Sequence, residues 1–123
     1  MNKIITALCI LLLFVSNSKA EETKKKVKAT WYQCCNKKTA NGEQFDPTKC
    51  TVASRYLPFG TQLKLTNPKN GNTVDTVVND RGPFVKGIDI DVTKGCAIAL
   101  GFFYSGTAKL LIENLEKIRK GEK

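Results

Sequence analysis

The sequence predicts a small, mainly β protein in which several short strands close into a barrel, accompanied by one short helix. Three observations lead to this prediction. The segments rich in β-forming residues are short, tight-turn signals separate them, and one segment carries helix caps. With 123 residues, the chain has room for a single domain.

Residues 1–20 have the pattern of a cleaved secretory signal peptide and are set aside from the fold. A short basic start precedes an apolar run over residues 4–15, and Ser18 and Ala20 are the small residues that signal peptidase reads. An uncleaved anchor is the alternative, but the run is too short to span a bilayer comfortably. We therefore expect a periplasmic or secreted protein without a stable membrane anchor.

Signal removal also changes the charge of the chain. The mature chain would have 103 residues, with 18 basic side chains against 11 acidic ones, a net charge of +7 compared with +9 for the full chain. This charge fits attraction to anionic polymers or surfaces. We expect a monomer, and nucleic acid is a poor partner for an exported chain that has no recognition motif.

The first half of the mature chain contains two predicted strands. Residues 21–28 are a charged lead-in, and residues 27–33 alternate and are rich in β-forming residues, which predicts a strand. Residues 36–49 are polar and contain turn signals, which indicates a loop. Residues 50–55 are a candidate for a second short strand, which the segment around Pro58 ends.

A β-hairpin is predicted in the middle of the chain. Residues 61–67 place Leu63 and Leu65 on one face, and residues 73–79 return as the second strand. The turn between them contains Asn70-Gly71, a pair suited to positive φ.

A short strand over residues 87–92 is predicted to lead into the helix. Either Asp91 or Thr93 suits the N-cap, the helix runs to Leu100, and Gly101 suits the position after its last turn.

The C-terminal segment has two interpretations. Residues 107–115 read as a final strand, followed by a charged tail over residues 116–123. A helix over residues 108–120 is the alternative, because its Lys, Leu, Glu and Ile residues also suit a helix.

Four cysteines remain after signal removal, namely Cys34, Cys35, Cys50 and Cys96. An even number in an exported chain predicts disulfides. A zinc site is the alternative, but two cysteines are adjacent and paired C-x-x-C knuckles are missing, so we expect no metal. Adjacent cysteines do not bridge each other easily. Cys34 and Cys35 are therefore each expected to pair with one of Cys50 and Cys96, which leaves two connectivities open.

The chain has no histidine, and this narrows the possible chemistry. Catalysis by Ser-His-Asp or Cys-His arrangements and metal ligation by His are excluded, so proton transfer falls to carboxylates, Lys, Tyr or Cys. Glu43 lies in the polar loop, Asp80 follows a strand, and Asp91 ends a short strand. Each also has a simpler interpretation as a solvated acid or, for Asp91, as a helix cap.

Five motifs in order resemble those of the rare lipoprotein A (RlpA) family. The resemblance spans about residues 29–113 and implies a six-stranded double-psi β-barrel with a domain over residues 29–115. The motifs are Thr-Trp-Tyr (30–32), Thr-Ala-Asn-Gly-Glu-Gln-Phe-Asp (39–46), Ala-Ser-Arg-Tyr-Leu-Pro-Phe-Gly-Thr (53–61), Asn-Asp-Arg-Gly-Pro-Phe (79–84) and Ile-Asp-Val-Thr (90–93).

The resemblance implies a peptidoglycan lytic transglycosylase that needs no cofactor. Such enzymes cleave the bond between N-acetylmuramic acid and N-acetylglucosamine in glycan strands without water and leave a 1,6-anhydro end. By motif match, the catalytic carboxyls are Glu43 and Asp80, and Asp91 matches an acid of the related expansin barrels. Ser54 stands where active family members carry a His.

Other residues near these motifs are candidates for glycan binding or support, namely Asp91, Ser54, Arg81, Trp31 and Tyr32. The two aromatic rings can stack on sugars or pack in the core. Besides the enzyme, a non-catalytic glycan-binding or expansin-like wall-loosening module stays open. A secreted inhibitor or toxin-like barrel is a third hypothesis.

Overall fold

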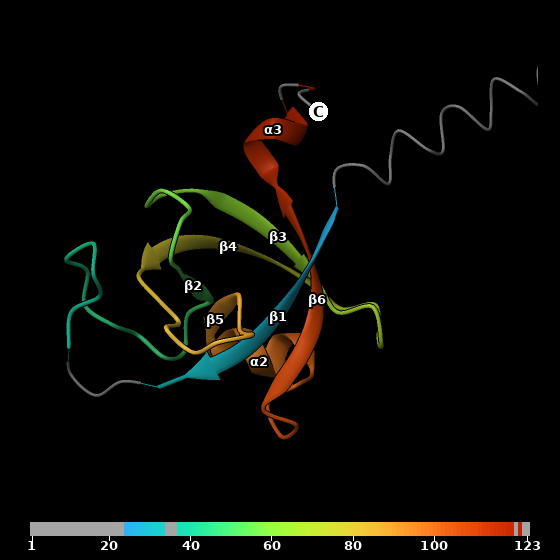
Figure 1. The fold of residues 1–123 in the computed structure, drawn as a ribbon, viewed down its shortest axis with the longest axis horizontal. Coiled ribbons are helices and arrows are strands. Elements are labelled where there is room, and N and C mark those ends of the chain that lie inside the picture. The colour runs from blue at the N-terminus through green and yellow to red at the C-terminus, as the bar shows by residue number, and fades with distance from the viewer. Residues whose placement is uncertain (1–23, 34–36, 120, 122–123) are drawn as a thin grey trace, which may run out of the picture.

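The computed structural model describes residues 24–33, 37–119 and 121, and within them it contains six strands and two short helices (Figure 1). The strands close into a barrel in the order β1-β5-β2-β4-β3-β6. This confirms the predicted six-stranded barrel and adds one helix. The elements are β1 (Lys25–Tyr32), β2 (Thr51–Ser54), β3 (Gln62–Thr66), β4 (Thr73–Asp80), β5 (Ile90–Thr93), α2 (Lys94–Leu100), β6 (Thr107–Asn114) and α3 (Leu115–Arg119).

Two parallel strand pairs distinguish this barrel from a simple meander. β1 pairs in parallel with β5, and β2 pairs in parallel with β4, whereas the other neighbours are antiparallel. Parallel strands need long crossover connections, so residues far apart in the sequence become neighbours. The ends of β2 and β4 therefore lie side by side, although residues 55–72, including all of β3, lie between these strands in the chain.

The barrel interior is filled by apolar side chains from all six strands. Helix α2 covers one side and contributes Cys96, Ala97 and Leu100, each with no exposed surface (Figure 1). Because strand side chains alternate between the two faces, the residues between these core positions point away from the interior. The strand residues of the core are Val27, Ala29, Val52, Leu63, Leu65, Val78, Ile90, Val92, Leu110 and Ile112.

The predicted hairpin is confirmed as β3 and β4, and its turn has a second role. Gly71 adopts a φ of 78°, as the Asn-Gly signal requires. The side-chain amides of Asn67 and Asn70 both donate to the carbonyl oxygen of Leu100, at 2.8 and 3.0 Å. The turn thereby satisfies a carbonyl at the C-terminal end of α2 that has no partner within the helix.

The predicted helix is confirmed as α2, and Thr93 is its N-cap. The Thr93 hydroxyl oxygen accepts a hydrogen bond from the backbone N–H of Cys96 at 3.4 Å. Gly101 follows the last turn in the left-handed region, with a φ of 80°. Since Thr93 supplies the cap, the carboxyl of Asp91 is not needed for it.

Strand and helix follow one another in the C-terminal segment. β6 ends at Asn114, whose side-chain oxygen accepts from the N–H of Glu116 at 3.0 Å as α3 begins. The segment expected to be a charged tail therefore begins as a helical turn. Within the described part of the chain, no helix is long and apolar enough to cross a membrane.

Two strand boundaries differ from the sequence-based expectation by more than one residue. β1 begins at Lys25 rather than at residue 27, because Lys25 still pairs with Ile112 of β6. β5 begins at Ile90 rather than at residue 87, because a turn with a hydrogen bond from Ile88 N–H to the Val85 carbonyl precedes it.

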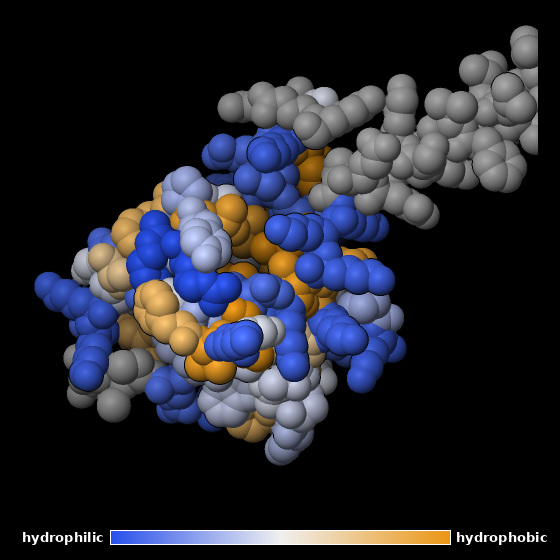
Figure 2. All heavy atoms as spheres, viewed as in Figure 1, coloured by the Kyte–Doolittle hydropathy of each residue, from blue (hydrophilic) through white to orange (hydrophobic). Residues whose placement is uncertain are grey.

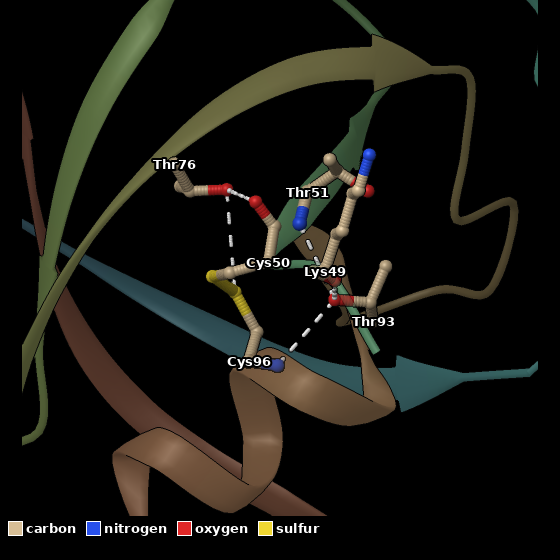
Figure 3. Close-up of a disulfide and its surroundings, with 6 residues drawn as sticks. All are labelled: Lys49, Cys50, Thr51, Thr76, Thr93 and Cys96. Atoms are coloured by element: carbon tan, nitrogen blue, oxygen red, sulfur yellow. Dashed lines mark hydrogen bonds between the residues drawn. A yellow bond between two sulfur atoms is a disulfide. The ribbon is translucent and has the colours of Figure 1, made fainter. Parts of the chain in front are cut away.

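The expected disulfide pairing is wrong. Cys50 and Cys96 bond to each other, with their Cα atoms 4.5 Å apart (Figure 3). The expectation paired each of them with Cys34 or Cys35, which lie outside the described residues. The physical reason is the antiparallel pairing of β2 with β5, which brings the start of β2 against the first turn of α2.

Threonine hydroxyls reinforce the structure around this disulfide (Figure 3). The Thr93 hydroxyl donates to the Lys49 carbonyl at 2.5 Å, and the Thr76 hydroxyl donates to the Cys50 carbonyl at 2.9 Å. We call the group formed by Lys49, Cys50, Thr76, Thr93 and Cys96 the disulfide corner. It joins β2, β4, β5 and α2 at one point.

Candidate active site

A row of four residues runs across neighbouring strands on the side of the barrel that faces away from the core. Thr30 of β1 pairs with Asp91 of β5, Asp91 pairs with Ala53 of β2, and Ala53 pairs with Asp80 of β4. The two acids therefore flank the small side chain of Ala53. We call Thr30, Asp91, Ala53 and Asp80 the acid row.

Asp80 is held by donors on both carboxylate oxygens. Oδ1 accepts from the backbone N–H groups of Ala40 and Arg81, each at 2.9 Å, and Oδ2 accepts from the Tyr32 hydroxyl at 3.0 Å. The Ala40 contact reaches across 40 residues of sequence. The carboxylate is thus oriented by β1, by the start of the loop after β1, and by its own strand.

Glu43 lies on that loop, beside the end of β4. One of its carboxylate oxygens accepts from the Asn41 side-chain amide at 2.7 Å, and the other lies 3.5 Å from the Asn79 side-chain nitrogen. The backbone N–H of Asn41 also donates to the Asn79 carbonyl at 3.2 Å. Asn79 and Asp80 together hold the loop, so Glu43 is placed near Asp80 while its side chain stays exposed.

Asp91 is the candidate acid whose pKa is raised by its surroundings. Partial burial raises the pKa of Asp91, and the negative charge of Asp80 raises it further. A hydrogen bond from the Thr30 hydroxyl to Asp91 acts in the opposite direction but does not cancel the rise. The acid row therefore contains one carboxyl with increased tendency to hold a proton, next to a second carboxyl.

Ser54 does not join the acids. It is buried, and its hydroxyl oxygen accepts from the backbone N–H groups of Tyr56 and Leu57 at 3.3 and 3.1 Å. Its strand neighbour across the pair with β5 is the core residue Ile90, whereas Ala53 is the member of the acid row. Ser54 therefore holds the turn after β2.

Arg81 also has a structural role. Its guanidinium donates to the carbonyls of Ser54 and Leu57 at 3.0 and 2.8 Å and lies 3.9 Å from the centre of the Phe59 ring. Arg55, which sequence analysis did not single out, donates in return to the carbonyls of Pro83 and Ile88. Each arginine thus holds the loop that follows the other's strand.

The two predicted aromatic residues separate because neighbouring residues of β1 point in opposite directions. Tyr32 contacts Asp80 through its hydroxyl and packs against Phe45, with ring centres 5.2 Å apart. Trp31 packs against Phe103 at 4.7 Å, and its ring N–H donates to the Phe103 carbonyl. Tyr32 belongs to the site, and Trp31 belongs to the edge of the core.

Asn79 is a site residue whose role the sequence analysis missed. It lies where the pairing of β2 with β4 shifts register, so that Ala53 pairs with Asp80 and Asn79 is the extra residue. Its side chain is 4% exposed, and the side-chain oxygen has no hydrogen-bond partner in the described structure. The only signal in the sequence was its position directly before Asp80 in a recognised motif.

Glu43 is exposed, and Asp80 and Asp91 are partly exposed, so solvent reaches all three acids. A pocket of about 450 Å³ elsewhere at the end of the barrel includes Ser54 but none of Glu43, Asp80 and Asp91. Among the described residues, no group of three or more Asp, Glu, Cys or His side chains has the arrangement of a metal site. The carboxyls of the acid row are groups that can donate or accept a proton.

Comparison with known proteins agrees with this arrangement. Residues 24–112 match the model of the family described as lytic transglycolase. A probable endolytic peptidoglycan transglycosylase RlpA of Nostoc sp. is 49% identical over 77 residues, which are 63% of this chain and 21% of that protein. An endolytic peptidoglycan transglycosylase RlpA of Neisseria meningitidis is 43% identical over 89 residues, 71% of this chain and 37% of that protein. The chain thus spans between about a fifth and two fifths of the length of these relatives.

Solved structures support the fold. The Streptomyces papain inhibitor superposes with a TM-score of 0.61 at 20% identity, over 73% of this chain and 92% of the inhibitor. An expansin of Clavibacter michiganensis, solved with cellohexaose, has a TM-score of 0.59 at 22% identity, over 74% of this chain and 50% of the expansin. At these identities, the likeness concerns the barrel alone. Together with the family match and the RlpA relatives, it places the chain in the lytic transglycolase family, as an RlpA-type double-psi β-barrel domain.

Proposed function

We propose that this protein is a peptidoglycan lytic transglycosylase that uses the carboxyls of Asp80, Asp91 and Glu43. The observation that supports this most directly is the pair of acids on the acid row, in which burial and the charge of Asp80 raise the pKa of Asp91. Proteins named as endolytic peptidoglycan transglycosylases are also 37–49% identical to this chain over the barrel.

The proposed reaction uses one carboxyl as acid and one as base. Asp91, whose raised pKa favours the protonated form, protonates the glycosidic oxygen as the bond to the anomeric carbon of the muramic acid breaks. The 6-hydroxyl of the same sugar then attacks that carbon, and a carboxylate takes the hydroxyl proton. Asp80 is proposed as this base because donors fix both of its oxygens. No water enters the product, so the new end is a 1,6-anhydro sugar.

Glu43 is proposed to contact the glycan beside Asp80. Its exposed carboxylate is steered by Asn41 and Asn79 toward the end of β4. The exposure of Glu43 and the partial exposure of Asp80 and Asp91 also leave these carboxyls accessible to a polymeric substrate. We infer action outside the cytoplasm, where the net charge of +7 expected for the mature chain would favour an anionic wall.

A non-catalytic wall-binding or expansin-like function is the second candidate. One observation favours it: Ser54 stands where active family members carry a His, and its hydroxyl accepts hydrogen bonds from backbone N–H groups. A serine does not exchange protons near neutral pH. If the family His is indispensable, this barrel would bind glycan without cleaving it.

Product analysis tests the enzymatic proposal. The mature protein is incubated with denuded sacculi, and mass spectrometry follows soluble glycans with anhydro ends. We expect these products from the wild type and from Asp75→Asn, which alters an exposed acid of β4, but not from Asp80→Asn. Binding to sacculi without anhydro products would contradict the proposal and favour the second candidate. Products with ordinary reducing ends would instead indicate hydrolysis.

A further inference from the structure

The pocket at the open end of the barrel has an apolar floor. It has a volume of about 450 Å³ and lies where β1 begins and β6 ends, beside α3. Val27, Leu63, Ile90 and Ile112 reach it from the core, and Ile118 of α3 lines its edge. Figure 2 looks onto this end of the molecule, where hydrophobic atoms lie in a hollow between hydrophilic side chains. The volume is in the range of pockets that hold small ligands.

Positive charge surrounds the mouth of this pocket. Lys25, Lys26 and Lys117 line it together with Arg55, against a single acid, Asp89. These lysines are exposed, and no ion pair is formed by them within the described parts of the chain. Asp89 is already engaged, since its carboxylate accepts from the Lys28 N–H at 2.8 Å. Among the described residues, the lysines of the rim therefore have no carboxylate partner.

We propose that this pocket binds one anionic amphiphile, with an alkyl chain in the cavity and a carboxylate or phosphate at the lysine rim. Burying an alkyl chain against the apolar floor is favourable in proportion to the area removed from water. A sugar would leave its hydroxyl groups without partners on the same floor, which is costly. The site lies apart from the acid row and works independently of the proposed cleavage.

Calorimetric titration of the mature protein with dodecanoate, well below its aggregation concentration, tests the proposal. We expect saturable 1:1 binding and no binding of acetate, which has the charge but no chain. Each shortening of the chain by two carbons should weaken binding roughly tenfold. Dodecanol, which has the chain but no charge, should bind more weakly than dodecanoate. Absence of saturable binding by dodecanoate would overturn the proposal.

Matched variants distinguish specific binding in this pocket from non-specific binding elsewhere on the protein. The pair Lys25→Glu and Lys117→Glu, combined in one protein, should weaken dodecanoate binding about tenfold. Lys69→Glu with Lys86→Glu makes the same charge change away from the pocket and should have little effect. Equal weakening by the two double variants would contradict a specific lysine rim.

A second pair of variants tests the apolar part of the pocket. Ile118→Asn alters the pocket edge, whereas Ile98→Asn alters an exposed isoleucine of α2, and these side chains are 41% and 56% exposed. Only Ile118→Asn should weaken binding, and thermal unfolding verifies that both variants are folded. Equal affinities of the two variants would contradict binding in this cavity.

Two further measurements identify the source of the ligand and separate this site from the acid row. Vesicles of phosphatidylglycerol, with phosphatidylcholine vesicles as the neutral control, distinguish a lipid surface from a free fatty acid. Binding to dodecanoate but not to phosphatidylglycerol vesicles would assign the free acid.

The variant Asp80→Asn should bind dodecanoate like the wild type, so a failed cleavage assay leaves this inference intact. Loss of dodecanoate binding in Asp80→Asn would contradict it.

Discussion

The disulfide corner and the acid row both involve β2, β4 and β5, but they differ in chemistry. The corner contains neutral hydroxyl groups around a disulfide, whereas the row contains two carboxyls. The corner uses Cys50 before β2, Thr76 of β4 and Thr93 of β5, whereas the row uses Ala53, Asp80 and Asp91 of those strands. At the corner, neutral hydroxyls donate to backbone carbonyls around a covalent bond. On the row, two carboxyls share one partly buried surface.

This difference distinguishes a region that stabilises the fold from a region that is proposed to carry the function. The corner combines cross-links and satisfied hydrogen bonds, all of which favour the folded state. The row keeps features that oppose folding, namely a raised pKa at Asp91 and, beside it, a buried Asn79 oxygen without a partner in the described structure. Local costs of this kind are expected at sites that carry function.

Replacing an acid of the row should have the largest effect. Asp91→Asn is expected to lower the release of anhydro products by about 10²–10⁴-fold, because it removes a proton donor. The same change should not lower the free energy of unfolding, since it removes a partly buried charge next to Asp80. Product rates and urea unfolding measure the two effects, with Asp75→Asn as the exposed control. Wild-type activity in Asp91→Asn would show that this acid is not the donor.

Removing the disulfide should lower the stability of the protein and preserve its activity, which is the reverse of the effects expected for Asp91→Asn. Cys50→Ser combined with Cys96→Ser opens a loop of 46 residues and should lower the free energy of unfolding by about 4 kcal/mol. Activity of the folded fraction should persist at low temperature, because the acid row lies further along the strands. Urea unfolding, with peptide mapping of the Cys50–Cys96 bond in the wild type, tests this. A variant as stable as the wild type would contradict the assigned role of the corner.

A smaller effect is expected at Ser54. Ser54→Ala removes the acceptor for the N–H groups of Tyr56 and Leu57 and should cost about 1 kcal/mol of stability. Product release should stay close to that of the wild type, because this side chain does not join the acids. A large loss of activity at unchanged stability would instead assign Ser54 to the chemistry.

The smallest effect is a change in the pH dependence of stability. The folded-state pKa of Asp91 lies above its ordinary value of 3.8, so the folded state binds the proton more tightly than the unfolded state. The stabilising contribution of the protonated form is complete below pH 3.8 and is lost as the pH rises through the raised pKa. Melting temperatures measured against pH should therefore fall more steeply in this window for the wild type than for Asp91→Asn. Parallel curves would contradict the raised pKa.

Local patterns in the sequence were enough to predict several elements. The hairpin of β3 and β4 follows from alternating apolar residues around Asn70-Gly71, and α2 follows from an N-cap candidate at Asp91 or Thr93 and from Gly101. The candidate acids were identified from the lack of histidine and from their positions in loops and at strand ends, and motifs that resemble a family assigned catalytic roles to Glu43 and Asp80. Their catalytic roles stay predictions.

Other features depended on contacts between distant parts of the chain. The sequence left open whether Asp91 or Thr93 capped the helix, and the hydrogen bond to Cys96 assigns Thr93. The pairing of Cys50 with Cys96 was missed because elimination among four cysteines ignores which strand ends meet. The role of Asn79 depends on a register shift between two parallel strands, which leaves no local pattern.

The sequence by itself determined the short strands, the turns and the C-terminal end of the helix at Gly101, because these depend on residues within a few positions of each other. Only the tertiary structure decided that Asp80 and Asp91 flank Ala53, that Ser54 supports a turn, and that Cys50 bonds to Cys96. The physical reason is the parallel pairing within a closed barrel, which makes neighbours of residues that the chain separates widely.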